Sequence, residues 1–237
     1  MISNMKQNLL YLLLGIFLLA SCQQEELPNA ETGYGYLSIS ELSVATTQVH
    51  VVSSRADEEP LTIEILKDEE TVQTLTETEL ANKIELEAGT GYSLKVYSSD
   101  YGKESEWTNE DKGTPVYYAE KKFEILTEQT TQVKVEVPMT NFGVSFQFPE
   151  EYKEVFPSCT LSVTVGGRTV ALQSGETAYF PYQEEKIFSY TLTATNKDGE
   201  PLTDTGSYGE EADKPIASGT IYTVSYEMET QSLNITE

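Results

Sequence analysis

The sequence predicts an all-β protein with two tandem antiparallel β-sandwich domains behind an N-terminal signal peptide. Three observations carry this prediction. Apolar and polar residues alternate with a period of two over much of the chain, similar segments recur 98 residues apart, and a short apolar segment ends in a cysteine. Period-2 alternation in segments rich in Val, Ile, Thr and Tyr is typical of strands that bury one face. No long window shows the period of an amphipathic helix.

The N-terminal segment has the parts of a secretory signal. Lys6 gives it a positive charge, residues 9–19 form an apolar stretch, and small residues precede Cys22. The sequence Leu19-Ala20-Ser21-Cys22 resembles a bacterial lipobox. This resemblance implies that residues 1–21 are a lipoprotein signal peptide and that Cys22 carries the lipid, palmitate included. A transmembrane helix is the alternative, but the stretch is shorter than the about 20 apolar residues that span a bilayer.

Residues 22–33 form the predicted lipidated tether in front of the first strand. The acidic segment Gln23-Gln24-Glu25-Glu26 directly follows the cysteine. It resembles the surface-export signal of lipoproteins from Gram-negative gut and oral bacteria, which implies an outer-membrane lipoprotein exposed at the cell surface. The membrane partner is then the outer membrane, reached through the lipid on Cys22. The choice between its inner and outer leaflet stays open.

Charge and composition exclude several classes of function. The formal net charge is -24, and so acidic a chain repels phosphates, so we expect no nucleic-acid partner. Cys159 shares one face of a predicted strand with Leu161, Val163 and Val165, which indicates a small buried residue. His50 is the only histidine and has no zinc-type cluster near it. Without a nucleophile elbow, phosphate-binding glycine loop or catalytic triad, we expect no enzymatic activity, no metal and no cofactor.

The predicted strands follow one another with short turns between them. They are Gly35–Ser40, Leu61–Ile65, Ile84–Leu86, Tyr92–Val96, Val133–Val137 and Cys159–Val165. Turn residues separate them at Lys67–Asp68, Gly89–Gly91 and Gly113–Pro115. Short helical turns are expected at Glu77–Asn82 and Glu150–Phe156. Hairpin-length connections between successive strands exclude a parallel α/β sheet.

An internal repeat divides the chain into two related halves. Three pairs share an offset of 98 residues: Thr62–Ile65 with Thr160–Val163, Val72 with Val170, and Tyr92–Val96 with Tyr190–Ala194. Near the ends of the halves, Thr131–Val135 resembles Thr220–Val224 at a smaller offset. We therefore predict one domain over residues 34–138 and a second over residues 139–237. About 100 residues is enough for a sandwich with its own core.

The segment Gly35-Tyr36-Leu37-Ser38-Ile39-Ser40, shortly after the lipobox, resembles an uncharacterised GYLS-type lipoprotein family of gut bacteria. More distantly, the layout resembles the fimbrillins, the type V pilins, and their accessory subunits. Those have a lipobox, a first strand, an arginine in a polar loop and two transthyretin-like or Ig-like sandwiches. The other supporting residues are Ser54–Ala56, Trp107, Tyr117–Tyr118 and Phe123–Ile125. The resemblance implies a structural or adhesive subunit that acts by β-strand addition to a pilin-like partner.

Arg55 is the main candidate site residue. It lies in the polar loop Ser53–Pro60, and exposed polar loops are where proteases cut. The fimbrillin resemblance implies that an arginine-specific protease cuts between Arg55 and Ala56 and releases the first strand. The alternative is an arginine that simply lies beside acidic neighbours. The other arginine of the mature chain, Arg168, lies in a tight hairpin after two glycines.

Aromatic residues suggest an alternative function. Trp107 is the only tryptophan and lies in a polar loop that also contains Tyr101. Together with Tyr117 and Tyr118 it would form an aromatic surface on which sugars stack, which indicates a glycan-binding surface lipoprotein of a polysaccharide uptake system. For Trp107 itself we favour the other interpretation, a side chain that folds back over the edge of a sandwich.

Overall fold

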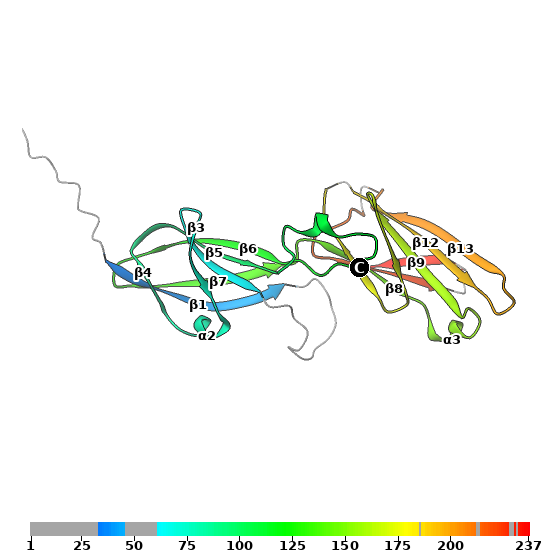
Figure 1. Ribbon diagram of the computed structural model, residues 1–237, viewed down its shortest axis with the longest axis horizontal. Helices are drawn as coiled ribbons and strands as arrows, with labels where there is room; N and C mark the ends of the chain where they lie inside the picture. The colour runs from blue at the N-terminus through cyan, green and yellow to red at the C-terminus, as the bar shows by residue number, and fades with distance from the viewer. Residues whose placement is uncertain (1–32, 46–60, 185, 212–213, 228–229, 231) are drawn as a thin grey trace, which may run out of the picture.

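The computed structural model describes residues 33–45, 61–184, 186–211, 214–227, 230 and 232–237. In this part the chain forms two β-sandwiches that lie end to end, with the N-terminal one at the left of Figure 1. The predicted all-β class with two tandem sandwiches is confirmed. The predicted signal peptide, the lipidated Cys22 and the Arg55–Ala56 bond lie outside the described residues. No helix of the described part is long and apolar enough to cross a membrane.

The first sandwich packs a three-stranded sheet, in the order β4-β1-β7, against a four-stranded sheet, in the order β3-β2-β5-β6. Its strands are β1 (Tyr34–Ala45), β2 (Thr62–Lys67), β3 (Glu70–Leu75), β4 (Ile84–Glu87), β5 (Gly89–Tyr97), β6 (Tyr118–Ile125) and β7 (Thr130–Pro138). The helical turn α2 (Glu77–Leu80) precedes β4, and the 3-10 turn η1 (Glu104–Glu106) lies between β5 and β6. Leu37, Ile65 and Leu94 are fully buried between the two sheets.

The second sandwich packs two four-stranded sheets, in the orders β11-β8-β14-β15 and β10-β9-β12-β13. Its strands are β8 (Phe142–Gln147), β9 (Ser158–Val165), β10 (Arg168–Leu172), β11 (Thr177–Phe180), β12 (Phe188–Thr195), β13 (Pro201–Tyr208), β14 (Ile221–Glu227) and β15 (Ser232–Thr236). The helical turn α3 (Glu150–Lys153) follows β8, so both helical turns lie where the sequence predicts them. The core is rich in aromatic rings, including the fully buried Phe142, Phe180 and Tyr222.

Both sandwiches share one strand order, which gives the internal repeat a structural counterpart. The order β4-β1-β7 corresponds to β11-β8-β14, and β3-β2-β5-β6 corresponds to β10-β9-β12-β13. β1 pairs antiparallel with β4 and parallel with β7, and β8 likewise pairs antiparallel with β11 and parallel with β14. The sequence predicts antiparallel sheets, and these two parallel pairs differ from that prediction. They form because the other sheet of the sandwich lies between the two strands in sequence and supplies the long crossover that parallel pairing needs.

The register of the repeat is not conserved between the two halves. In the first sandwich Ile65 lies opposite Leu94, whereas in the second Val163 lies opposite Tyr190. A 98-residue offset would place Val163 opposite Leu192, so the pairing is shifted by two residues. A shift of two keeps every side chain on its original face, which preserves both cores.

The matched valines Val72 and Val170 also differ in their surroundings. Between Ile65 and Leu66 the β2–β3 pairing has a bulge that leaves Val72 without an opposite residue, and its side chain is 50% exposed. Val170 pairs with Val163 and is 2% exposed. Sequence similarity at this pair therefore does not reflect an equivalent packing position.

Cys159 provides a test of the second core. It lies in β9, packs against that core and is half-buried, and burial raises the pKa of its thiol to about 11. Because the thiolate is the reactive form, Cys159 should react about a hundredfold more slowly with a disulfide reagent than an unfolded thiol at mildly alkaline pH. The reaction is followed by absorbance before and after unfolding in concentrated urea. Equal rates in the two states would contradict this packing.

Candidate functional site

β1 is the middle strand of the smaller sheet of the first sandwich and is paired on both of its edges. From Tyr34 to Leu37 it pairs antiparallel with β4. Its other edge pairs parallel with β7, with a bulge between Ile39 and Glu41. Loss of such a middle strand leaves two unpaired edges, which are unstable in isolation.

Two residues fix the start of β1 in the core. Leu37 is fully buried, and complete burial of a leucine side chain contributes roughly 1.5–3 kcal/mol. Gly35 is buried as well, and a Cβ atom at this position would lie 2.2 Å from the carbonyl oxygen of Leu126. Position 35 therefore excludes a side chain, and the glycine lets β1 approach the β6–β7 connection closely.

The rest of β1 is less buried than its counterpart β8 in the second sandwich. Only two of the twelve residues of β1 are buried, whereas four of the six residues of β8 are. β8 contributes Phe142, Val144 and Phe146 to its core, all at 0% exposure. Since both strands occupy the same position in their sheets, β1 is the central strand whose removal exposes less apolar surface.

The two sandwiches are joined through Arg168, the first residue of β10. Its guanidinium donates hydrogen bonds to three backbone carbonyls: Nε to Thr108 at 2.8 Å, Nη1 to Tyr179 at 2.6 Å, and Nη2 to Asp111. Thr108 and Asp111 belong to the β5–β6 connection of the first sandwich. The rigid fork of an arginine satisfies several acceptors at once, so one side chain fixes this connection to the second sandwich.

Local electrostatics support this contact. Burial lowers the pKa of the Arg168 guanidinium, and the negative charge of Asp111 opposes that shift. The carboxylate of Asp111 accepts hydrogen bonds from the backbone N–H and the hydroxyl of Thr108, each at 2.8 Å. These bonds, and to a lesser degree Arg168, hold the pKa of Asp111 below its usual range. The ionised carboxylate thus closes the turn whose carbonyls face the guanidinium.

Trp107 is half-buried beside this arginine. The guanidinium carbon of Arg168 lies 5.4 Å from the centre of the indole ring, within the range of a cation–π contact. A Cβ atom at Gly113, whose φ is +69°, would lie 2.9 Å from the ring, so the loop backbone packs directly on the indole. The structure therefore places Trp107 at the junction between the sandwiches, and its contact with a glycan stays a prediction.

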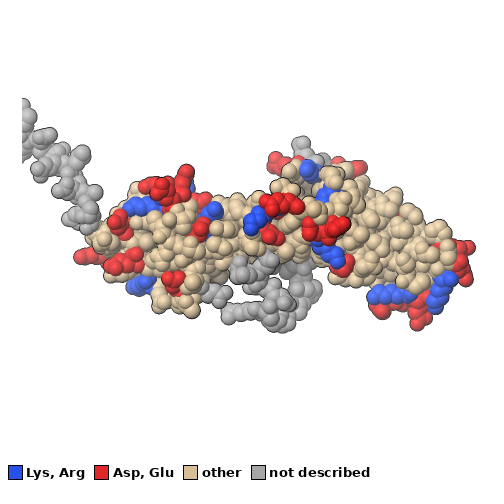
Figure 2. All heavy atoms as spheres, in the orientation of Figure 1, with Lys and Arg blue, Asp and Glu red and all other residues tan. Residues whose placement is uncertain are grey.

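The β5–β6 connection also covers two strand edges of the second sandwich. The side-chain oxygen of Asn109 accepts a hydrogen bond from the backbone N–H of Thr169 in β10 at 3.0 Å. The carbonyl of Lys112 accepts one from the N–H of Tyr179 in β11 at 2.7 Å, and its ammonium pairs with Glu176. Covering an edge in this way prevents its pairing with another chain. On the face shown in Figure 2, acidic and basic side chains gather over this junction and at both ends of the molecule.

The chain passes between the sandwiches at the fully buried Asn141. Its side-chain amide donates to the carbonyl of Thr114 at 2.8 Å and accepts from the N–H of Val116 at 3.0 Å. Its own carbonyl accepts from the N–H of Gly219 at 2.8 Å. A buried polar group without a partner costs about 1–3 kcal/mol, so these three bonds favour a single geometry of the linker.

The predicted tyrosines lie on the first sandwich. Tyr101 and Tyr118 stack with their ring centres 4.2 Å apart and their planes at 8°. Tyr118 donates a hydrogen bond to Glu120, and burial followed by this bond raises the pKa of Tyr118 to about 12. Tyr117 packs against the first core instead. The structure thus brings two of the four predicted aromatic residues together, and their contact with a glycan stays a prediction.

The role of Arg168 at the junction of the sandwiches is not predicted from the sequence. The only local signal is an arginine that directly follows two glycines in an acidic chain, and this signal names no partner. The carbonyls of Thr108 and Asp111 lie 60 and 57 positions earlier in the sequence. Within the described ranges, no group of three or more His, Cys, Asp or Glu side chains is placed to hold a metal ion.

Comparison with known proteins gives one family match. The model of the family described as "Domain of unknown function (DUF4493)" matches residues 31–236. No curated protein matches the chain. Among solved structures, a fimbrilin from Porphyromonas gingivalis W83 is 11% identical, with a TM-score of 0.44 over 86% of this chain and 95% of that chain.

Two further solved structures have similar coverage. A protein from Bacteroides eggerthii DSM 20697, provisionally described as a cell adhesion protein, is 9% identical, with a TM-score of 0.45 over 87% of this chain and 94% of that chain. A protein from Bacteroides thetaiotaomicron VPI-5482, provisionally described as polysaccharide binding (DUF1812), is 11% identical. Its TM-score is 0.37 over 81% of this chain and 91% of that chain.

Replacing Arg168 with alanine should loosen the junction while both cores stay folded. Trp107 is the only tryptophan, so its fluorescence reports on this contact directly. In Arg168→Ala we expect a red-shifted emission and stronger quenching by iodide, because the indole loses the cation that covers it. Two of the three lost hydrogen bonds, those to Thr108 and Asp111, hold the loop, and at about 1 kcal/mol each their loss loosens it.

Arg168→Lys should show most of the same change, since an ammonium group does not replace a planar fork. Lys197→Ala, at the exposed β12–β13 turn, removes the same charge elsewhere in the second sandwich and should leave the emission unchanged. An Arg168→Ala protein with the emission and quenching of the original chain would show that this residue does not hold the junction.

Proposed function

This chain belongs to the DUF4493 family, and we propose that it is a non-enzymatic structural or adhesive subunit of the cell envelope that acts by β-strand addition. One observation carries the proposal: β1, the first strand of the described residues, is the middle strand of its sheet, yet only two of its twelve residues are buried. A strand in this position is essential for closing the sheet and is comparatively easy to replace. Strand addition uses backbone hydrogen bonds for affinity and side-chain pockets for register.

The acceptor in this proposal is the groove that β1 occupies. When β1 leaves, β4 and β7 both lose their hydrogen-bonding partner, and the pocket of Leu37 opens to water. A donor strand from a partner subunit restores both ladders if it places an apolar side chain in that pocket. The position of Gly35 sets a second requirement, because only a glycine fits beside the carbonyl of Leu126.

The duplicated architecture supports assigning the exchange to the first sandwich alone. β8 fills the equivalent position in the second sandwich with three fully buried side chains, two of them phenylalanines. Its removal exposes a larger apolar surface, so the second sandwich acts as the stable half of the subunit. In the same proposal, cleavage between Arg55 and Ala56 releases β1, and the lipid on Cys22 anchors the subunit to the outer membrane.

The glycan-binding alternative now rests on fewer residues. Trp107 contacts Arg168 and Gly113 at the junction, which leaves the stacked pair Tyr101 and Tyr118 to carry it. No further observation favours this alternative, and it stays a prediction.

Controlled proteolysis tests the exchange of β1. An arginine-specific protease added to the full chain should cut after Arg55 well before Arg168, whose guanidinium is engaged by three carbonyls. The cut protein should then bind a labelled peptide with the sequence of residues 34–45, measured by fluorescence anisotropy. The uncut protein should not bind it, because its own β1 occupies the groove.

Two controls make this result specific. A peptide in which aspartate replaces Leu37 and Ile39 should not bind, since a charge cannot enter the apolar pocket. An Arg55→Lys protein, incubated with the same protease, should remain uncut and should not capture the peptide. A cut protein that stays monomeric and binds neither peptide would exclude the mechanism.

A further inference from the structure

The edge strands of the four sheets differ in how they are protected from pairing with other chains. An open edge presents unpaired backbone groups, and proteins protect such edges with charges, prolines, bulges or covering loops. Within the described residues the edge strands are β3, β4, β6 and β7 in the first sandwich and β10, β11, β13 and β15 in the second. Seven of these eight carry at least one such device.

The edges of the first sandwich are protected by charge and by a bulge. β4 contains Glu85 and Glu87, and β7 contains Lys134 and ends at Pro138. β6 carries a charge on its inner face, because Lys121 lies directly opposite the core residue Leu94. β3 is interrupted by the bulge opposite β2.

Three edges of the second sandwich are protected in other ways. The β5–β6 connection covers β10 and β11 through Asn109 and Lys112, as described above. β13 begins with Pro201 and places Asp204 opposite the buried Leu192, which turns a carboxylate toward the core. Burial is the main cause of the raised pKa of the nearby Tyr190, and the negative charge of Asp204 adds to it.

β15 has none of these devices. Its sequence, Ser232-Leu233-Asn234-Ile235-Thr236, contains no charged residue and no proline, and the structure pairs it with β14 alone. Five residues give an edge about 17 Å long. Beside this edge lies a groove of about 750 Å³ between β15 and β13.

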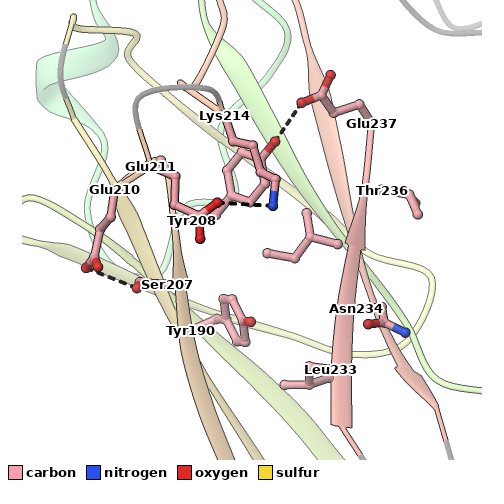
Figure 3. A pocket seen from close by; sticks show the side chains of 12 residues that line it. Tyr190, Ser207, Tyr208, Glu210, Glu211, Lys214, Leu233, Asn234, Thr236 and Glu237 are labelled. Carbon is pink, nitrogen blue, oxygen red and sulfur yellow. Dashed lines mark hydrogen bonds and ion pairs between the residues drawn. The ribbon is translucent and has the colours of Figure 1, made fainter. Parts of the chain in front are cut away.

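The groove has an apolar floor. Figure 3 shows Leu233 and Tyr190 extending into the space between β13 and β15, whereas Asn234 and Thr236 point away from it. Leu233 and Ile235 are only partly buried against the second core. The arrangement suits an extended chain whose alternate side chains insert beside them, because a strand presents a side chain to one face at every second residue.

The rim of the groove is acidic. Glu210 accepts a hydrogen bond from the hydroxyl of Ser207 at 3.0 Å, and Glu237 accepts one from Tyr208 at 2.6 Å. A hydroxyl donor is neutral, so these two bonds do not compensate the charge of either carboxylate. A third rim carboxylate, Glu211, forms an ion pair with Lys214 at 3.1 Å. The rim therefore favours an occupant with basic side chains.

From these observations we propose that β15 is a second strand-addition site, which binds an extended basic segment of a partner protein. The segment adds to the free edge of β15, inserts alternate apolar side chains into the groove and directs its lysines or arginines to Glu210 and Glu237. A second copy of this chain is a poor occupant, because each copy carries a formal charge of -24 and they repel one another. The site does not depend on exchange of β1, because it lies on the other sandwich.

Binding of model peptides to the full, uncut chain tests the proposal. The probe is a labelled peptide of alternating lysine and valine. The reference has the same composition but groups all valines together, so that it cannot present one apolar face. Measured by fluorescence anisotropy, the alternating peptide should bind at least about tenfold more tightly, since only it matches the strand period. Equal affinities would show attraction by charge alone and would overturn the proposal.

Charge reversal locates the site. A Glu210→Lys and Glu237→Lys double variant should weaken binding of the alternating peptide about tenfold, because two attractive rim contacts become repulsive. Glu151→Lys with Glu154→Lys, on and beside the exposed α3, makes the same change in net charge and should have little effect. Equal losses in both double variants would show that only the net charge matters and would overturn the site.

Hydrogen exchange identifies the strand that is covered. Binding should slow exchange at residues 232–236, and the affinity should be the same before and after cleavage at Arg55. Protection confined to the first sandwich, or binding by the cut protein alone, would overturn the β15 site and leave the exchange of β1 standing. A dimer of the uncut chain in sedimentation experiments, with β15 protected before any peptide is added, would identify a second copy as the occupant and overturn the proposed partner.

Discussion

The guanidinium of Arg168 is the contact on which the arrangement of the molecule depends. It holds the β5–β6 connection of the first sandwich against β10 and β11 of the second through three backbone carbonyls. With that connection in place, Trp107 is covered and two edges of the second sandwich are closed. The opposite side of the same sandwich, between β13 and β15, is left as its open side. Arg168 thus joins the two halves together with Asn109, Lys112 and Asn141. The side of the second sandwich away from this junction is the surface that we propose for a partner.

The two halves share a strand order but differ in how firmly they hold their central strand. β8 fills its core with phenylalanines, whereas β1 contributes mainly Leu37. In a sandwich of about 100 residues the net stability is a small difference between large terms, so two fewer buried side chains in one strand are a considerable loss for that strand. The same topology therefore holds its central strand more firmly in the second sandwich than in the first, and the exchange that we propose for β1 rests on this difference at a few positions within one strand.

The edge strands of both sandwiches are protected from pairing with other chains by the same few features. Where the fold leaves an edge open, a charge on the inner face, a proline, a bulge or the neighbouring sandwich prevents addition, as Lys121 and Asp204 illustrate. β15 lacks these features and lies beside a groove with apolar side chains at its floor and an acidic rim. An acidic chain that presents one unprotected edge selects its partners by both strand pattern and charge.

The sequence by itself determined where six of the strands lie: period-2 alternation located β1, β2, β4, β5, β7 and β9, and turn residues separated several of them. The position of Cys159 on an inner face followed from the apolar residues that share that face. These features are local, since the side chains of a strand alternate whatever the strand pairs with. Only the tertiary structure decided that β1 runs parallel to β7, that the register of the repeat shifts by two residues, and that β15 forms an edge. It also decided that Arg168 and Trp107 meet across the junction. Each of these is a contact between residues far apart in the chain, and alternation fixes which face a side chain takes but not which distant strand or loop lies against it.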